Sequence, residues 1–505
     1  MPTGFKNRLR SCAARAVTAL FFVVVLSAAA VAQTIPCPVS ANTTVSDVSY
    51  NASTVCVVQS GVTLTVASSG TLNNVGPGAT GGTITNDGTF TNDGNFFNEK
   101  STLTNFGSVF NNGDISGGTV TNTGILDNFG SMSGDSSGPL VLNNAGNLTN
   151  VGLLESGGFG SVTASTNTLG ATINNTNAAI LDIGGPFNNN GTIENFGGGN
   201  LTVDLGGTVT NAGNLKNDAG ATLSNNGTLI NNPGANLVNN GTLTTNGGFE
   251  NLGILTNSGN SVLDVASGTT LANSGAIANS GVVVVEVGSV LSNLAGGSYI
   301  QTAGSLTSTY VAGTMNSVSP VQIQGGELLG SGTINGNVDN AAGLVSPGDS
   351  GIPGVLTING SYSQGLDGAL QIFLNGAAPG DFNVLDVSGL ATLDGTVEID
   401  VAPGFTPEAG DDFTFLLFGS LSGDFAHFDF DDCPTDDTCS EVVGANSLSL
   451  DILGPTSGGG GSGGSVPTPE PSTTALLAFG LLFLSGLVWM RRGAAPGRAC
   501  ARTMS

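Results

Sequence analysis

Five aspartates crowd around two cysteines near the C-terminal end of this 505-residue chain, at Cys433 and Cys439. Carboxylate oxygens are the ligands that Ca²⁺ prefers, so this loop has the residue types best suited to bind a metal ion. Neither an EF-hand spacing nor a Gly-Asp calcium repeat is present, and we favour the alternative, a solvated acidic turn closed by a disulfide. We therefore predict no firm metal site and no cofactor, and keep one set of Ca²⁺ candidates: Asp429, Asp431, Asp432, Asp436 and Asp437.

Catalytic chemistry has little support in the sequence. His427 is the only histidine, and no nucleophile motif lies near it, so a Ser-His-Asp arrangement is unsupported. Lyases of acidic glycans commonly bind the substrate carboxylate with Arg or Lys, and no Arg occurs between Gln33 and Met490. Paired carboxylates, as in glycoside hydrolases, stay open only because Asp and Glu are abundant. We predict that the protein is not an enzyme and assign no catalytic residue; a β-helical polysaccharide-degrading enzyme is the less favoured alternative.

The N-terminus has the three parts of a secretory signal peptide. Basic residues between Lys6 and Arg15 precede an apolar run, and Ala30 and Ala32 form a small-residue cleavage signal. We predict a signal peptide over residues 1–32 and a mature chain that starts at Gln33.

The exported part is strongly acidic. Between Gln33 and Pro471 only Lys100 and Lys216 oppose all 36 Asp and Glu residues, which gives a formal charge near −34. Nucleic acids and anionic membrane surfaces bind clustered basic residues, so we predict no nucleic-acid partner.

Four cysteines remain in the exported part, in two local pairs. Four cysteines allow three connectivities, and proximity favours Cys37 with Cys56 and Cys433 with Cys439. Disulfides agree with an oxidising compartment. We interpret residues 33–70 as an N-terminal cap with a disulfide.

The body of the chain repeats an Asn-x-Gly unit, often every six residues, as at Asn86 and Asn92 or Asn105 and Asn111. The full unit is N-x-G-T-Φ-T, where Φ is one aliphatic residue or Phe. We expect Asn and Gly to form tight turns with positive φ. Thr-Φ-Thr then runs extended, with Φ on one face and the hydroxyls on the other. So short a strand becomes stable only when stacked on copies of itself.

The sequence therefore predicts an all-β fold, a parallel β-helix or β-solenoid of Asn-x-Gly hexapeptide-like repeats over residues 71–343. We expect three sides per coil, ~18–22 residues per coil and ~12–15 coils. Disorder is the alternative for a segment rich in Gly and Asn, but its aliphatic residues are periodic and the mean hydropathy is positive, +0.21. The predicted inward residues are Ile84, Phe90, Phe96, Leu103, Ile115, Val120, Leu215, Leu223, Leu229, Leu237 and Leu243.

Longer alternating strands follow in residues 344–453, with runs such as LVSPGDSGIPGVLTING and DDFTFLLFGSLSGDF. These runs resemble the terminal portion of autotransporter-type β-helical passengers, which implies a β-helical body. We interpret the segment as a β-rich cap that closes the solenoid. A Gly/Ser/Pro linker then covers residues 454–468.

The last part of the chain combines three features in order. Pro469, Glu470 and Pro471 form a stiff acidic tripeptide, residues 474–490 carry no charge, and Arg491 and Arg492 follow. The uncharged segment is long enough for one C-terminal transmembrane helix, with the arginines and residues 493–505 on the cytoplasmic side. Residues 469–492 resemble the sorting signal of the PEP-CTERM family of exported Gram-negative proteins.

That resemblance implies an exosortase-type processing enzyme as partner and an intermediate anchored in the inner membrane. It also implies a final place at the cell surface or in the extracellular matrix, where such proteins accompany exopolysaccharide and biofilm. We therefore predict a structural or adhesive protein whose partner is exopolysaccharide or a cell-surface glycan. The alternatives are a membrane-anchored adhesin that is not released and, from the Thr-Φ-Thr rows, an ice-binding solenoid.

Overall fold

The computed structural model describes residues 33–46, 49–51, 55–74, 81–135, 138–157, 161–304, 306–430, 433–434 and 437–454. Within these ranges the protein is all-β, from β1 (Gln33–Thr34) to β55 (Ser447–Leu453). The predicted signal peptide, sorting signal, transmembrane helix and cytoplasmic tail lie outside the described residues. Among those that are described, no helix has the length and apolar character needed to cross a membrane.

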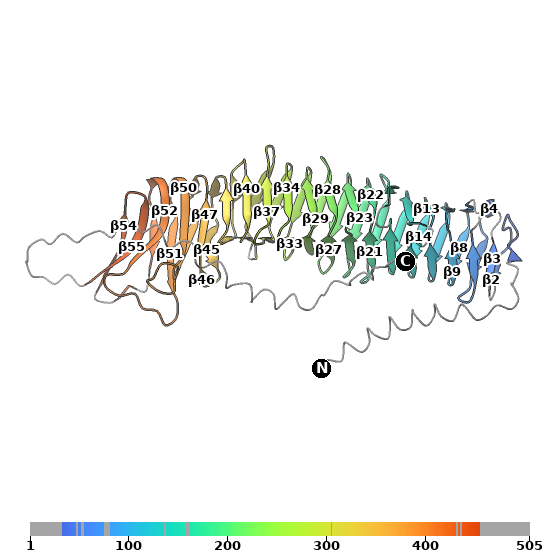
Figure 1. Cartoon of the computed structure of the whole chain (residues 1–505), viewed down its shortest axis with the longest axis horizontal. Helices are drawn as coiled ribbons and strands as arrows, with labels where there is room; N and C mark the ends of the chain where they lie inside the picture. Colours follow the sequence, from blue (N-terminus) through green and yellow to red (C-terminus); the bar gives the residue numbers. More distant parts are fainter. Residues whose placement is uncertain are drawn as a thin grey trace, which may run out of the picture. The chain divides into compact units, whose positions relative to one another are not determined.

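Each coil of the regular region contributes three short strands, one to each side. Every strand pairs in parallel and in register with its counterpart in the next coil, so three columns of strands form (Figure 1). This arrangement is the predicted three-sided β-solenoid. Two successive coils consist of β7 (Thr83–Asn86), β8 (Thr89–Asn92) and β9 (Asn95–Phe97), then β10 (Thr102–Asn105), β11 (Ser108–Asn111) and β12 (Asp114–Ser116).

The number of coils agrees with the prediction. From β4 (Val55–Val58) to β45 (Leu344–Asp349) the chain makes about 14 turns. Equivalent residues of neighbouring coils are separated by as few as 17 and as many as 28 residues, a wider range than expected. The regular strands have three or four residues, so the turns absorb this variation.

The solenoid interior is a continuous apolar core. Residues alternate inward and outward along each strand, as in β7, where Ile84 is buried between the half-exposed Thr83 and Thr85. The predicted inward residues are confirmed. All of them, from Ile84 to Leu243, are at most 1% exposed.

At the C-terminal end of the stack the strand direction changes. β47 (Val355–Ile358), β49 (Ala369–Leu374) and β51 (Thr396–Val401) still pair in parallel with strands of neighbouring coils. β52 (Asp412–Gly423) then pairs antiparallel with β55, which pairs antiparallel with β54 (Thr438–Val443). These last strands extend the sheet beyond its parallel pairs, with β54 as the edge strand among the described residues.

Most Asn-x-Gly triplets are not the positive-φ turns that we expected; in the described triplets the glycine has positive φ only at Gly197, Gly234 and Gly259. Among the described residues other than glycine, only Lys100, Asn177 and Ala178 have positive φ. Most triplet asparagines instead end the strands, with side chains turned inward and fully buried, as at Asn86 and Asn92, whereas Asn232 and Asn246 lie just after a strand and are not buried.

Glycine at the third position of the triplet usually serves close packing between coils. A Cβ at Gly107 would lie 2.1 Å from the carbonyl oxygen of Gly88 in the preceding coil, and a Cβ at Gly113 would lie 2.1 Å from that of Gly94. Neither glycine has positive φ. The backbone of one coil therefore approaches the next too closely for any side chain at these corners.

Candidate functional sites

Two ladders of buried asparagines run through the solenoid interior. In each ladder the Nδ2 of one asparagine donates a hydrogen bond to the Oδ1 of the asparagine in the next coil, over 2.6 to 3.0 Å. The first ladder contains Asn86, Asn105, Asn122, Asn144, Asn167, Asn189, Asn211, Asn231, Asn251, Asn273 and Asn293. The second contains Asn92, Asn111, Asn128, Asn150, Asn175, Asn195, Asn217, Asn239, Asn257 and Asn279.

Each interior amide of a ladder is satisfied on both sides. Asn211 accepts from Asn189 at Oδ1 over 2.7 Å. Its Nδ2 donates to Asn231 Oδ1 over 2.8 Å and to the backbone oxygen of Asn236 over 3.0 Å. All donors point from the N-terminal coil to the next coil, so the amide dipoles align and polarise one another. The ladders stabilise the fold, and no reactive group belongs to them.

The two ends of the ladders differ. Val58 and Val66 occupy the ladder positions in the coil before Asn86 and Asn92, and the Oδ1 atoms of these two asparagines accept no hydrogen bond from described residues. At the other end, the Nδ2 of Asn293 donates to Ser317 Oγ over 2.9 Å. The stack thus begins with unsatisfied acceptors and ends with satisfied donors.

Stacked carboxylates lie on the outer face of the column that contains β18 (Leu153–Ser156) and β21 (Ile180–Ile183). Glu155 and Asp182 stand directly opposite each other in the register, and Asp204 is near both. Burial, and then repulsion from Asp182 and Asp204, raise the pKa of Glu155. Burial and the Asp204 charge raise the pKa of Asp182. No group of three or more His, Cys, Asp or Glu side chains among the described residues has an arrangement suited to a metal ion.

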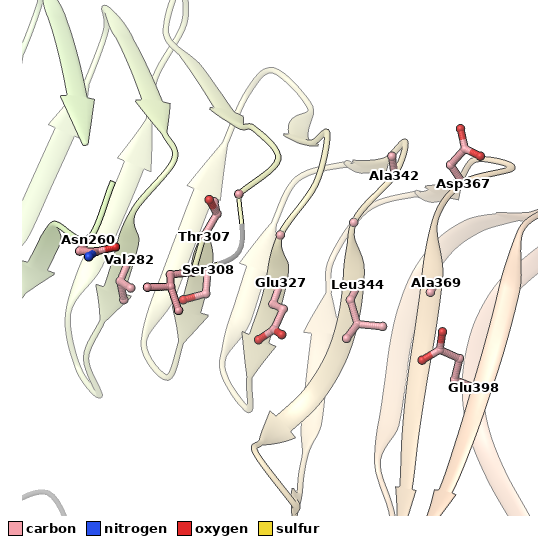
Figure 2. Close-up of a pocket in the computed structure, with 14 residues that line it drawn as sticks. Asn260, Val282, Thr307, Ser308, Glu327, Ala342, Leu344, Asp367, Ala369 and Glu398 are labelled. Carbon is pink, nitrogen blue, oxygen red and sulfur yellow. The ribbon is translucent and has the colours of Figure 1, made fainter. Parts of the chain in front are cut away.

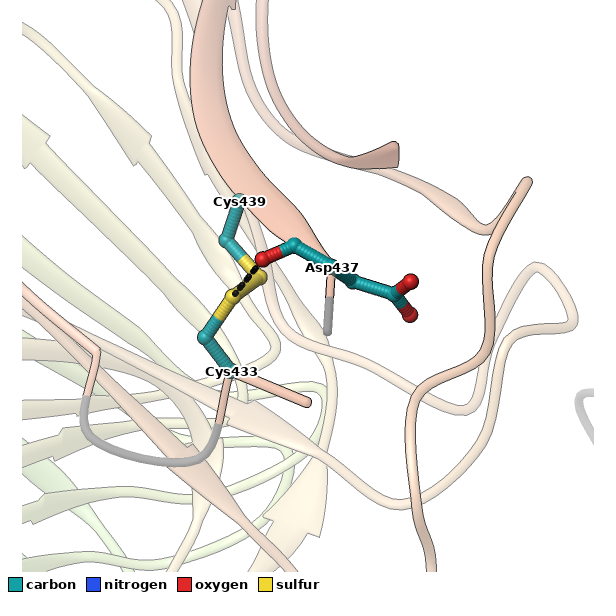
Figure 3. Close-up of a disulfide and its surroundings, with 3 residues drawn as sticks. All are labelled: Cys433, Asp437 and Cys439. Carbon is teal, nitrogen blue, oxygen red and sulfur yellow. Dashed lines mark hydrogen bonds between the residues drawn. A yellow bond between two sulfur atoms is a disulfide. The ribbon is translucent and has the colours of Figure 1, made fainter. Parts of the chain in front are cut away.

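The residues predicted around the C-terminal disulfide are only partly described. Cys433 and Cys439 are joined by a disulfide, as are Cys37 and Cys56. Figure 3 shows the carboxylate of Asp437 pointing away from the sulfur atoms, whereas its backbone oxygen lies 3.8 Å from Cys433 Sγ. Asp429 ends β53 (His427–Asp429) opposite Glu398, which places two carboxylates side by side. Asp431, Asp432 and Asp436 lie outside the described residues.

Among the described carboxylates, Glu441 in β54 has the most strongly perturbed pKa. Burial and the nearby charge of Asp424 raise its pKa to about 7, and its Oε1 is buried without a hydrogen-bond partner among the described groups. The folded protein therefore keeps a proton on Glu441 at pH values where the unfolded chain has lost it. Consequently the contribution of Glu441 to stability falls as the pH rises from about 4.5 to about 7.

We expect the Glu441→Gln substitution to raise the melting temperature at pH 8 and to have little effect at pH 4, because glutamine cannot ionise. Thermal unfolding at both pH values measures the change. Glu250→Gln, at an exposed strand position, is the control and should show no such difference between the two pH values. Equal shifts in the two variants would contradict a role for the buried carboxylate.

A groove of about 690 Å³ crosses several coils near the C-terminal end of the regular region. Its floor includes β42 (Glu327–Gly330), β45 and β49, with Leu344 and Ala369 at strand positions (Figure 2). Figure 2 shows the carboxylates of Glu327 and Glu398 at the level of the strands and Asp367 on a turn above them. Burial and the charges of Asp400 and Asp429 raise the pKa of Glu398. The described residues that line this groove include no Lys, Arg or His.

Comparison with known protein families identifies a sorting motif near the C-terminal end of the sequence. Residues 467–492 match the PEP-CTERM protein-sorting motif, which confirms the resemblance found in the sequence. The motif and the β-solenoid define the class, an exported surface protein that is sorted by an exosortase through a membrane-anchored intermediate. No curated protein matches the chain.

Proposed function

We propose that the protein is a structural and adhesive component of the cell surface or extracellular matrix, associated with exopolysaccharide and biofilm. The observation that carries this proposal is the sorting motif at residues 467–492, which follows a long β-solenoid. The inward side chains of the solenoid pack and pair with one another, so its outer faces are left for contacts. They repeat half-exposed Thr positions, as in β7 and β8. Many weak contacts of one kind reinforce one another by multivalency.

A non-catalytic role without a cofactor is part of this proposal. Glu327 and Glu398, the strand carboxylates of the groove, are separated by three parallel strand steps, roughly 14 Å along the stack. Glycoside hydrolases hold their two carboxyl groups about 5–9.5 Å apart, so this spacing supports binding over hydrolysis for these two residues. Release of reducing sugar from host matrix by the purified protein would favour the enzyme alternative.

Peptide mapping by mass spectrometry, on cells and matrix separately, tests the sorting part of the proposal. We expect the matrix form to end near Pro469, Glu470 and Pro471, and to lack Arg491. Replacement of all three motif residues by alanine is expected to abolish this processed form almost completely. Pro455→Ala, in the linker before the motif, is the control and should be processed normally. An intact C-terminus found only in membranes would favour the anchored adhesin that is not released.

A further inference from the structure

We propose that the groove beside Glu327 and Glu398 binds a glycan chain of amino sugars whose amines are free. This inference rests on the proposed function only in taking a surface glycan as the partner, and it adds the site and the chemical class of the sugar. The volume of the groove, about 690 Å³, lies within the range of ligand sites, roughly 300–1,000 Å³.

The direction of the groove favours a chain over a compact ligand. Val282, Ser308, Glu327, Leu344 and Ala369 all line it, and they occupy directly opposed positions on five successive strands of one column. Each step between strands is about 4.8 Å, so this row extends roughly 19 Å along the stack. A ligand must have several units in a row to contact both Glu327 and Glu398.

The floor is shaped for flat rings. Gly326, Gly343 and Ala369 carry little or no side chain, whereas Leu344 presents apolar surface next to them and Val282 does so farther along the groove. At Gly326 a Cβ would lie 2.4 Å from the backbone oxygen of Thr307, so no larger residue fits there without a shift. Sugar rings have apolar C–H faces, which suit such a floor.

The charge of the groove selects the sugar. Glu327, Asp367 and Glu398 are not opposed by any lysine or arginine of the lining, and their carboxylates have no hydrogen-bond partner among the described residues. Hydrogen bonds from ammonium groups to carboxylates are charge-assisted and stronger than neutral ones. A glycan of glucosamine type supplies an ammonium group on each ring, whereas a chain of uronic acids would be repelled.

Calorimetric titration of the purified full-length protein with a glucosamine hexamer tests the site, with the N-acetylated hexamer as the uncharged probe. We expect binding of the free amine form and at least tenfold weaker binding of the acetylated form. The triple variant Glu327→Gln, Asp367→Asn, Glu398→Gln should lose binding at least tenfold. Ala369→Trp, which fills the groove without changing its charge, should do the same.

A matched control separates the site from attraction by the acidic surface as a whole. The triple variant Glu155→Gln, Asp182→Asn, Asp204→Asn removes the same charge from stacked positions outside the groove, and its affinity should stay within twofold. Equal loss in both triple variants would overturn the proposal, as would equal binding of the two hexamers. If hexalysine bound as tightly as the glucosamine hexamer and lost its affinity in the groove triple variant, the assignment to a glycan would be overturned. C-terminal processing does not involve the groove, so a negative result would leave the proposed sorting intact.

Discussion

Replacing Asn211 by leucine is expected to destabilise the solenoid by about 3 kcal/mol or more. Leucine has the same number of side-chain heavy atoms and the same branching, so the change removes hydrogen bonds without leaving a cavity. It removes four hydrogen bonds, one from the Nδ2 of Asn189 and three to the Oδ1 of Asn231 and the backbone oxygens of Asn236 and Gly213. Each buried polar group that loses its partner costs about 1–3 kcal/mol.

The measurement is denaturant unfolding combined with hydrogen exchange of the coils around Asn211, because a stack of repeats unfolds locally as well as globally. Asn190→Leu is the matched control, since Asn190 is exposed at the corner of the preceding coil, just after the ladder residue Asn189, and its side chain has no hydrogen bond among the described residues. It should change stability by less than about 0.5 kcal/mol. If Asn211→Leu were as mild as this control, the ladder would be dispensable for stability.

The second large effect is expected at a corner glycine. A Cβ at Gly247 would lie 2.1 Å from the carbonyl oxygen of Gly227 in the preceding coil, a distance that no rotamer can relieve. The two coils must separate locally, which breaks the register of their strands. We expect Gly247→Ala to cost about 3 kcal/mol, the upper end of the range for overpacking, because both clashing groups belong to the backbone.

The next residue supplies the control for this prediction. Gly248 also lacks positive φ, and a Cβ there would meet no atom within 4 Å. Gly248→Ala should therefore be neutral or stabilise the fold by up to about 1 kcal/mol, because alanine restricts the unfolded chain. Thermal unfolding of the two variants compares neighbouring residues that differ only in the space around them. Similar melting temperatures would show that the coils adjust more easily than the structure indicates.

The sequence allowed the solenoid and its apolar core to be predicted because both follow from period-two alternation in short strands. The same alternation also indicated that the asparagines of the ladders point inward, but our sequence analysis did not predict the ladders. Ile84 and Asn86 are two residues apart in one strand, so a buried Ile84 requires that Asn86 also points inward. The strong preference of Asn and Gly for turns suggested a local role, although the actual partners of Asn86 belong to the next coil.

The groove and the antiparallel strands near the C-terminal end had no comparable signal. Glu327 and Glu398 are far apart in the sequence, and only the stacking of β42, β45, β49 and β51 brings them to one face. The switch from parallel to antiparallel pairing at β52 depends on where the chain turns back, which alternation does not specify. The acidic loop, in contrast, was conspicuous in the sequence, yet the described carboxylate of Asp437 points away from the disulfide.

The uniform rungs of the ladders also bear on how such a protein can change in evolution. One asparagine and its partner 22 residues later, such as Asn189 and Asn211, make the same bonds as the pairs before and after them. After duplication or deletion of one whole coil, each ladder asparagine would therefore still face an asparagine in the neighbouring coil. Insertion or deletion of a fraction of a coil would break this pairing. The interior sets no preferred length for the molecule. Its reach is fixed where asparagine gives way to other residues, at Val58 and Val66 before the first rungs and at Ser317 and Gln301 after the last.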